Sequence, residues 1–449
     1  MEESSIKKYS YSFLSALKHR INGGMVLMIV AVLAMIIANS PWASHYQTFW
    51  HHPVSLSIGE FNLFSHHGKP LTLIQFINDA LMALFFFSVG LEIKREIMVG
   101  ELCSVRKALL PIIAALGGMI IPVGLYFAIA HTSPESRGLA IPMATDIAFS
   151  LGVLSLFGKR VPISLKIFLT AFAVVDDIGG ILVIAIFYTN DISITYMLLS
   201  ALVVVILYLG NRMGVMHRIF YIFFGIVMWY FFLQSGVHCT IAGVIVAFLV
   251  PAKPRINVKH YIERMRESIN KFPLTEEDED DGVDKIVLDN AQIDELKSIE
   301  AASDRVISPL QSLENSMHGW VNYFIMPLFA FANAGVRISA GGDSFGVITL
   351  AVFVGLTLGK FVGVYLFTFL AIKSRVVEMP KGMDWRNLIG VSLLGGIGFT
   401  VSLFIANLSF ARQYPELLNQ AKLGVLLGTV TAGVLGYIVL SMVLPKYKK

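Results

Sequence analysis

Long runs of apolar residues, separated by short polar segments, occupy most of the chain. A helix needs about 20 mostly apolar residues to cross the roughly 30 Å hydrocarbon core of a bilayer. By that length the pattern predicts an all-α membrane protein with about twelve spanning helices. They lie near residues 22–39, 72–91, 109–130, 138–157, 163–188, 193–210, 217–233, 237–250, 319–335, 345–371, 387–410 and 421–444. The eighth and ninth runs are short for a span, and helix-breaking residues interrupt the fourth and the eleventh.

The segment between the first two runs, residues 40–71, has a different period. Apolar residues alternate with polar ones, and Gly59, Asn62 and Gly68 punctuate the pattern. Alternation bounded by turn residues is typical of short β-strands. We therefore predict a small β-hairpin here, on the side of the membrane opposite the N-terminus.

A second polar segment, residues 251–318, separates the eighth run from the ninth. It begins with basic residues, continues with an acidic run at 276–281 and then shows a helix-like pattern at about 286–302. The acidic run fits a solvated linker, and the alternative is a regulatory site for an ion or a partner. We expect three parts: 1–250 with the first eight helices, 251–318 as a loop insertion, and 319–449 with the last four helices.

Basic residues are distributed unevenly between the two sides of the predicted bundle. They are concentrated on the side of the N-terminus, whereas the other side holds Lys69, Arg137, Arg337 and Arg412. Cytoplasmic loops carry the excess of Lys and Arg, so we predict that both termini are cytoplasmic. The first run has no A-x-A-like site and eleven more runs follow it, so no cleaved signal peptide is expected.

Composition excludes several other classes of protein. Of the residues, 55% are hydrophobic and 15% are charged, and the mean hydropathy is +0.70. Soluble domains carry roughly 25% charged residues, and disordered chains have low hydrophobicity, so neither class fits. The net charge of +4 gives no reason to expect a nucleic-acid partner. Two cysteines, Cys103 and Cys239, are too few for a secreted disulfide scaffold.

Ionisable residues inside the apolar runs are the first functional candidates. Each costs at least about 2.5–3.5 kcal/mol to insert, so it is expected to serve a function. The candidates are Asp79, Asp146, Asp176, Asp177 and Lys360, with Glu92 at the end of one run and His238 at the start of another. Lys166 and Lys422 lie nearer to helix ends, where their side chains are expected to reach toward the interface.

Asp176 and Asp177 lie side by side in the middle of the fifth run. Two adjacent carboxylates cannot both be ionised cheaply in hydrocarbon, and a small hard cation prefers oxygen ligands. The pair is therefore suited to exchange protons for such a cation. The alternative interpretation is a capping pair at a helix kink near Gly179 and Gly180.

The two interrupted runs carry related signals. Pro142 and Asp146 lie in the fourth, and the eleventh is rich in glycine at 395–398. Facing half-helix ends leave uncompensated dipoles, which Asp146 at two positive ends and Lys360 at two negative ends would neutralise. The offset from fourth to eleventh is odd, so helices three to five and ten to twelve would form an inverted repeat, as in secondary transporters. For a single glycine, close helix packing is the alternative.

Together these residues resemble the NhaA family of sodium–proton antiporters. The resemblance runs in order over residues 20–251 and 314–444. It is carried by the segment Phe86–Glu96, PMATDIAF around Thr145 and Asp146, the Asp176–Asp177 pair, GVHCTIAG around His238, PLFAFANAG ending at Gly335, Gly359–Lys360 and GIGFT at 396–400.

The resemblance implies a twelve-helix fold whose fourth and eleventh helices are unwound where they cross. It also implies a homodimer helped by the outer hairpin, located in the bacterial inner membrane. The implied activity is pH-regulated, electrogenic export of Na⁺ or Li⁺ in exchange for protons, in sodium and pH homeostasis. A transporter of this kind is not an enzyme and needs no cofactor.

The resemblance also assigns roles to residues. Asp177 would be the principal Na⁺ ligand, and Asp176 its partner, able to pair with Lys360. Thr145, Asp146 and Gly398 would support the helix crossing and the approach to the site. The pH-response candidates are Glu92, Glu96, His238, Glu314 and His318, although His238 fits a structural role equally well. The chain departs from the family pattern in its long 251–318 loop and at Asn315, where the family has a histidine.

Two other functions also use aspartates within membrane helices or a sodium gradient. An intramembrane aspartyl protease takes its aspartates from two helices, one within a Gly-x-Gly-Asp motif that this sequence lacks. Adjacent aspartates on one helix instead project about 100° apart. A sodium-coupled solute symporter on a related fold is the closer alternative. It would need a pocket for an organic solute, and solute uptake in a sodium gradient distinguishes it.

Overall fold

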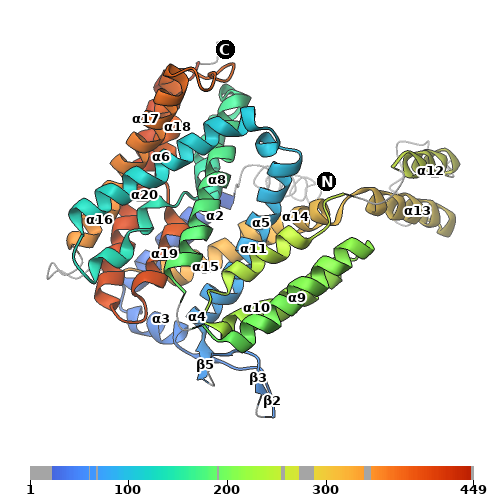
Figure 1. Ribbon diagram of the computed structural model, residues 1–449, viewed down its shortest axis with the longest axis horizontal. Helices are drawn as coiled ribbons and strands as arrows, with labels where there is room; N and C mark the ends of the chain where they lie inside the picture. The colour runs from blue at the N-terminus through green and yellow to red at the C-terminus, as the bar shows by residue number, and fades with distance from the viewer. Residues whose placement is uncertain are drawn as a thin grey trace, which may run out of the picture.

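The computed structural model describes residues 23–59, 61–66, 69–189, 192–253, 258–272, 288–337 and 345–445. These residues form a bundle of helices with a small group of strands at one end (Figure 1). The helices are α2 (Gly23–Ala38), α3 (Ala43–Trp50), α4 (Leu73–Phe76), α5 (Met82–Met98), α6 (Val105–Ile129), α7 (Ile147–Ser155), α8 (Ile163–Phe187), α9 (Ile194–Met213), α10 (Arg218–Ser235), α11 (Thr240–Leu249), α12 (Val258–Lys271), α13 (Asn290–Val306), α14 (Pro309–Trp320), α15 (Met326–Asn333), α16 (Val347–Val354), α17 (Lys360–Lys373), α18 (Trp385–Leu394), α19 (Phe399–Phe410) and α20 (Pro415–Val443). Single π-helical turns, Ile77–Leu81, Val321–Ile325 and Gly355–Gly359, join α4 to α5, α14 to α15 and α16 to α17.

The helices match the predicted spans. Seven continuous stretches of the described residues are long and apolar enough to cross a membrane: Leu73–Met98, Val105–Ile129, Ile163–Phe187, Ile194–Met213, Arg218–Ser235, Val347–Lys373 and Pro415–Val443. The fourth and eleventh predicted spans are bent pairs, with bends of 41° before α7 and 43° between α18 and α19. Helices α2, α11 and α15 occupy the three remaining positions. The fold is therefore consistent with the predicted twelve-helix membrane protein.

Local signals in the sequence set many of the helix ends. The Ser308 hydroxyl accepts a hydrogen bond from the backbone of Gln311 and caps α14, and Pro309 follows at the first helical position. Gly214 and Gly236 end α9 and α10 in the left-handed region of backbone space, which glycine adopts without a steric penalty. Helix boundaries near polar segments are thus encoded locally.

The predicted outer excursion contains five short antiparallel strands. They are β1 (Pro53–Val54), β2 (Ser57–Ile58), β3 (Phe61–Asn62), β4 (Ser65–His66) and β5 (Lys69–Thr72). One sheet has the order β1-β5-β4, with Pro53 opposite Thr72, and β2 pairs with β3. Helix α3, which the sequence pattern did not predict, precedes the strands at 114° to α2. The Tyr46 hydroxyl donates to the Phe331 carbonyl and holds α3 on the bundle. We call the end of the bundle with these strands the hairpin end (Figure 1).

The 251–318 segment contributes α12, α13 and the start of the helix that leads into α15. Helices α12 and α13 pack against each other and project away from the bundle (Figure 1). Ser268 on α12 and Ser298 on α13 are hydrogen-bonded through their hydroxyls at 3.2 Å. The predicted helix-like stretch is confirmed as α13, shifted a few residues toward the C-terminus. The acidic run at 276–281 lies outside the described residues.

Apolar side chains form two clusters. The larger surrounds the two bent spans and includes α2, α5 to α8 and α15 to α20, whereas the smaller packs α9, α10 and α11 against another face of α5. Helices α6 and α17 approach closely at Gly117 and Gly363, where a Cβ atom on either glycine would overlap the backbone of the other. This close approach fixes the start of α17, and with it Lys360, inside the larger cluster.

Two features of the helices differ from what the sequence pattern allows or predicts. Helix α8 continues without a break through Gly179 and Gly180, so Asp176 and Asp177 do not cap a kink. Lys422 is 7% exposed inside α20, so its side chain is packed in the bundle and does not extend along the surface toward the interface as expected. The helix that contains it begins at Pro415, earlier than the predicted span, which places Lys422 further from the helix end.

Candidate ion-binding site

The two bent spans cross at their unwound segments, residues 144–146 and 395–398. The Asp146 N–H donates to the Ile397 carbonyl at 2.7 Å, and the Thr145 hydroxyl donates to the Gly395 carbonyl at 2.9 Å. Two more hydroxyls act in the same way, Ser150 on Leu394 and Ser402 on Ile141. Backbone groups released by the breaks are therefore satisfied within the protein, as a break at membrane depth requires.

The Asp146 carboxylate joins the N-termini of two half-helices. Its Oδ1 accepts from the Phe149 N–H at 3.0 Å, which caps α7. Its Oδ2 accepts from the Thr400 N–H at 3.1 Å and from the Thr400 hydroxyl at 2.6 Å, which caps α19. Asp146 is 1% exposed. The arrangement is the one expected for an anion at two positive helix ends.

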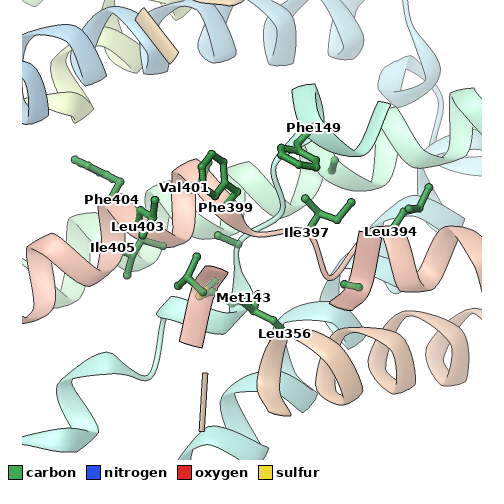
Figure 2. Packing of buried hydrophobic residues seen from close by; sticks show 14 of the residues in the cluster. Met143, Phe149, Leu356, Leu394, Ile397, Phe399, Val401, Leu403, Phe404 and Ile405 are labelled. Carbon is green, nitrogen blue, oxygen red and sulfur yellow. The ribbon is translucent and has the colours of Figure 1, made fainter. Parts of the chain in front are cut away.

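Gly398 lies in the unwound segment of the eleventh span, at the crossing. A Cβ atom there would overlap the Ser402 hydroxyl and approach the Ala144 carbonyl. Larger residues are therefore excluded from this position. Apolar side chains of both spans, including Phe149, Ile397 and Phe399, surround the crossing (Figure 2). Charges near the crossing therefore interact in a medium of low polarity.

Lys360 forms a buried ion pair with Asp176. The Lys360 Nζ lies 2.6 Å from Asp176 Oδ2, and neither side chain has any solvent exposure. The Phe172 ring lies 5.5 Å from the same Nζ and adds a cation–π contact. The backbone carbonyls at the crossing accept hydrogen bonds from the hydroxyls named above. The Lys360 ammonium instead pairs with a carboxylate of the aspartate pair.

Asp176 keeps one carboxylate oxygen available, and Asp177 lies directly beside it in the chain. Asp176 Oδ1 has no hydrogen-bond partner within the described part of the chain, although the residue is 1% exposed. Asp177 is 5% exposed and interacts electrostatically with Asp176, Glu92, Asp146 and Lys360. Acidic groups thus outnumber the basic group among these five residues, and carboxylate oxygens are ligands that a hard cation prefers.

A second group of acidic residues lies at the end of the bundle opposite the hairpin end. Arg95 on α5 forms ion pairs with Glu96 at 3.0 Å and with Glu314 on α14 at 2.9 Å. Glu96 Oε2 also accepts from the Glu101 N–H at 3.0 Å. Glu92 interacts electrostatically with the same three residues, Arg95, Glu96 and Glu314. We call Glu92, Arg95, Glu96 and Glu314 the acidic cluster.

His318 and His238 are placed differently. His318 follows Glu314 by one helical turn, is exposed, and lies with its Nε2 3.1 Å from the Asn322 amide. His238 lies beside Asp79, at the other end of the helix that carries Glu92 and Glu96. The structure therefore separates the pH-response candidates into two groups, one at each end of that helix.

Burial raises the pKa of the Glu314 carboxyl above its ordinary value, while the Arg95 guanidinium opposes the shift. The carboxyl therefore stays protonated to a higher pH than a solvated glutamate and ionises as the pH rises. We expect Glu314→Gln to move the pH dependence of transport toward lower pH, because the remaining acidic groups of the cluster lose a negative neighbour. The shift should stay below about one pH unit, since Glu314 and Arg95 are partly solvated.

The measurement is the initial transport rate against cytoplasmic-side pH in reconstituted vesicles. Glu267→Gln is the matched control, because Glu267 is exposed on α12, away from the acidic cluster. The same shift in both variants, or a shift to higher pH in Glu314→Gln, would contradict the prediction.

Sequence reasoning missed two residues of this site. Thr400 supplies two donors to Asp146, and Arg95 links Glu96 to Glu314. A hydroxyl residue two positions after the glycine-rich break was a usable signal for Thr400. Arg95, which directly follows Lys94 in the chain, gave no such signal, because a basic residue near a span end usually indicates topology only.

Comparisons with known proteins support one family. A family model described as Na+/H+ antiporter 1 matches residues 15–440. The Na(+)/H(+) antiporter NhaA of Phocaeicola vulgatus is 61% identical over 448 residues, covering 99% of both chains. The proteins of the same name from Bacteroides thetaiotaomicron and Porphyromonas gingivalis are 60% and 46% identical, covering 96% and 93% of this chain and 97% and 93% of their own.

These alignments also bear on the long 251–318 segment. An alignment of 448 residues that covers 99% of both chains includes this segment, so the Phocaeicola vulgatus protein has one of similar length. The departure from the expected loop length is thus shared with a relative. With the family model matching nearly the whole chain, and with the crossing and the aspartate pair in place, the chain belongs to the Na+/H+ antiporter 1 family.

Proposed function

We propose that this chain is an electrogenic antiporter that moves Na⁺ or Li⁺ out of the cell in exchange for protons. The observation that carries the proposal is the buried Asp176–Lys360 ion pair, which lies next to Asp177; among the described residues none donates a hydrogen bond to Asp176 Oδ1. Relatives at 46–61% identity are named Na(+)/H(+) antiporters, which favours antiport over solute symport.

Protons and the cation compete for one site in this mechanism. When the site faces the cytoplasm, Asp176 and Asp177 lose protons and bind the cation through carboxylate oxygens. The loaded site then becomes accessible from outside, where protons displace the cation. The crossing at Asp146 and Thr400 provides a joint at which the half-helices change their tilt while their capping bonds persist.

Two arrangements give two protons for each cation. Either both carboxylates carry a proton, or Lys360 carries the second one. The 2.6 Å ion pair favours the second arrangement, because a cation bound to Asp176 weakens the hold of that carboxylate on the ammonium. In both cases a net positive charge moves inward, and a membrane potential supplies about 2.3 kcal/mol per charge per 100 mV.

The cellular setting follows from the same proposal. We place the protein in the bacterial inner membrane as a multi-pass homodimer, with both termini cytoplasmic and the hairpin end outside. The acidic cluster then faces the cytoplasm, where it regulates transport by pH in sodium and pH homeostasis. The transported ions are the substrates, the protein acts as a transporter and not as an enzyme, and no cofactor takes part.

The proposed activity is tested in proteoliposomes with a preset proton gradient. Adding Na⁺ or Li⁺ should collapse the gradient, and K⁺ should do so much less, because carboxylate oxygens favour small, hard cations. A pH-sensitive dye reports the collapse. If no cation moves protons at any pH from mildly acidic to mildly alkaline, the proposal is wrong.

A further inference from the structure

Three side chains with metal-binding chemistry meet at the hairpin end, away from the aspartate pair. They are Asp79, His238 and Cys239, and one ligand atom of each lies within 4.8 Å of the others. Asp79 lies in the π-helical turn before α5, and His238 and Cys239 directly precede α11. The proposed transport mechanism uses neither Asp79 nor Cys239.

The histidine is already oriented for coordination. Its Nδ1 is hydrogen-bonded to the Thr240 hydroxyl at 2.8 Å, which leaves Nε2 directed toward Asp79 Oδ1 at 3.8 Å. In metal sites the second ring nitrogen of a ligating histidine has such a partner, which fixes the ring. Thr240 therefore acts as an outer support for a metal-binding His238.

The segment that carries Asp79 is also fixed in place. The Asp79 backbone carbonyl accepts from Trp229 Nε1 at 3.2 Å and from Cys239 Sγ at 3.3 Å. The thiol is thus held against the same residue that offers a carboxylate. Ligand atoms at about 2.0–2.3 Å from Zn²⁺ stand about 3.3–3.8 Å apart around a tetrahedron, so the observed Nε2–Oδ1 separation requires little movement.

Two of the three side chains are partly exposed, and one basic residue lies near them. The Asp79 and His238 side chains are 24% and 11% exposed, whereas Cys239 is buried. Arg412 interacts electrostatically with both Asp79 and His238 and opposes a cation. Because Arg412 itself is exposed, water and salt screen its effect.

From this geometry we propose that Asp79, His238 and Cys239 form a binding site for a divalent cation of the Zn²⁺ and Cd²⁺ class. The three side chains supply one oxygen, one nitrogen and one sulfur ligand, and water takes the fourth position. On binding, the Cys239 thiol releases its proton to solvent and coordinates as a thiolate. The set differs from the aspartate pair, whose all-oxygen ligands suit alkali cations.

The two cysteines of the chain make a direct test possible. Cd²⁺ is titrated into the purified full-length protein in detergent, and the sulfur-to-cadmium charge-transfer absorption is recorded. Wild type and Cys103→Ser should show the same saturable band, and Zn²⁺ should compete it away. Cys239→Ser should lose the band, and His238→Gln should weaken binding at least about tenfold, since a ligand is lost.

Two controls keep the test decisive. Cys239→Ser retains a donor for the Asp79 carbonyl, and elution of this variant as wild type on size exclusion shows that the fold is intact. Asp177→Asn should keep the band, which separates this site from the transport site. A band that persists in Cys239→Ser, disappears in Cys103→Ser, or never saturates overturns the proposal.

Discussion

Asp177→Asn is expected to abolish Na⁺- and Li⁺-dependent proton movement. The amide keeps the size of the side chain but removes the charge and the exchangeable proton from the more exposed member of the pair. One carboxylate charge about 4 Å from a bound cation is worth about 4 kcal/mol at an effective dielectric constant of 20. Its loss therefore lowers cation affinity by about a thousandfold. The collapse of a preset proton gradient in proteoliposomes, together with sodium binding to the purified protein, measures the effect.

The matched control is Asp384→Asn, which makes the same chemical change at an exposed position before α18. It should transport as wild type. Asp176→Asn tests the partner separately. It leaves Lys360 buried without its carboxylate, so it should also lower the thermal stability of the protein in detergent. Full transport by Asp177→Asn would show that the site is assigned to the wrong residues.

The sequence predicted the spans and their interruptions because both are local properties of the chain. Apolar runs long enough for a bilayer stood out, and Pro142 and the glycines at 395–398 marked the two breaks that the structure shows. The hairpin was predicted for the same reason, since alternation and turn residues are local. Helix α3 was not, because its eight residues are too few to establish a helical period against an adjacent strand-like pattern.

The contacts between distant segments were harder to predict. The functional importance of Asp146 could be inferred from the free energy needed to place a carboxylate in the membrane. Its hydrogen bond to Thr400 could not, because it joins residues 254 positions apart. Likewise, the sequence indicated that Lys360 is a functional charge, but it did not show whether the Lys360 ammonium neutralises the negative ends of two half-helices or pairs with an aspartate. Packing of α17 against α6 brings Lys360 to Asp176 of α8, and this packing depends on surfaces that no single segment specifies.

Asp146→Ala is expected to weaken the crossing and to slow transport strongly. The change removes the caps of α7 and α19, each worth about 1 kcal/mol, and leaves the Thr400 hydroxyl buried without an acceptor, at a cost of about 1–3 kcal/mol. The unfolding temperature in detergent should fall by several degrees, and the transport rate should fall because the crossing adjoins the aspartate pair. Asp146→Asn, which keeps an acceptor oxygen, should show a smaller effect.

A double-mutant cycle with Thr400→Val identifies the contact responsible. Because Thr400→Val removes the hydroxyl that donates to Asp146 Oδ2, both single changes break this same hydrogen bond, and the loss of stability in the double variant should be clearly smaller than the sum of the single losses. Asp289→Ala is the matched control. It removes a helix cap of the same kind from α13, which packs on α12 outside the bundle, so transport should be unchanged. If Asp146→Ala has the unfolding temperature and the transport rate of wild type, or if the two losses of stability simply add, then this carboxylate does not hold the two half-helices together.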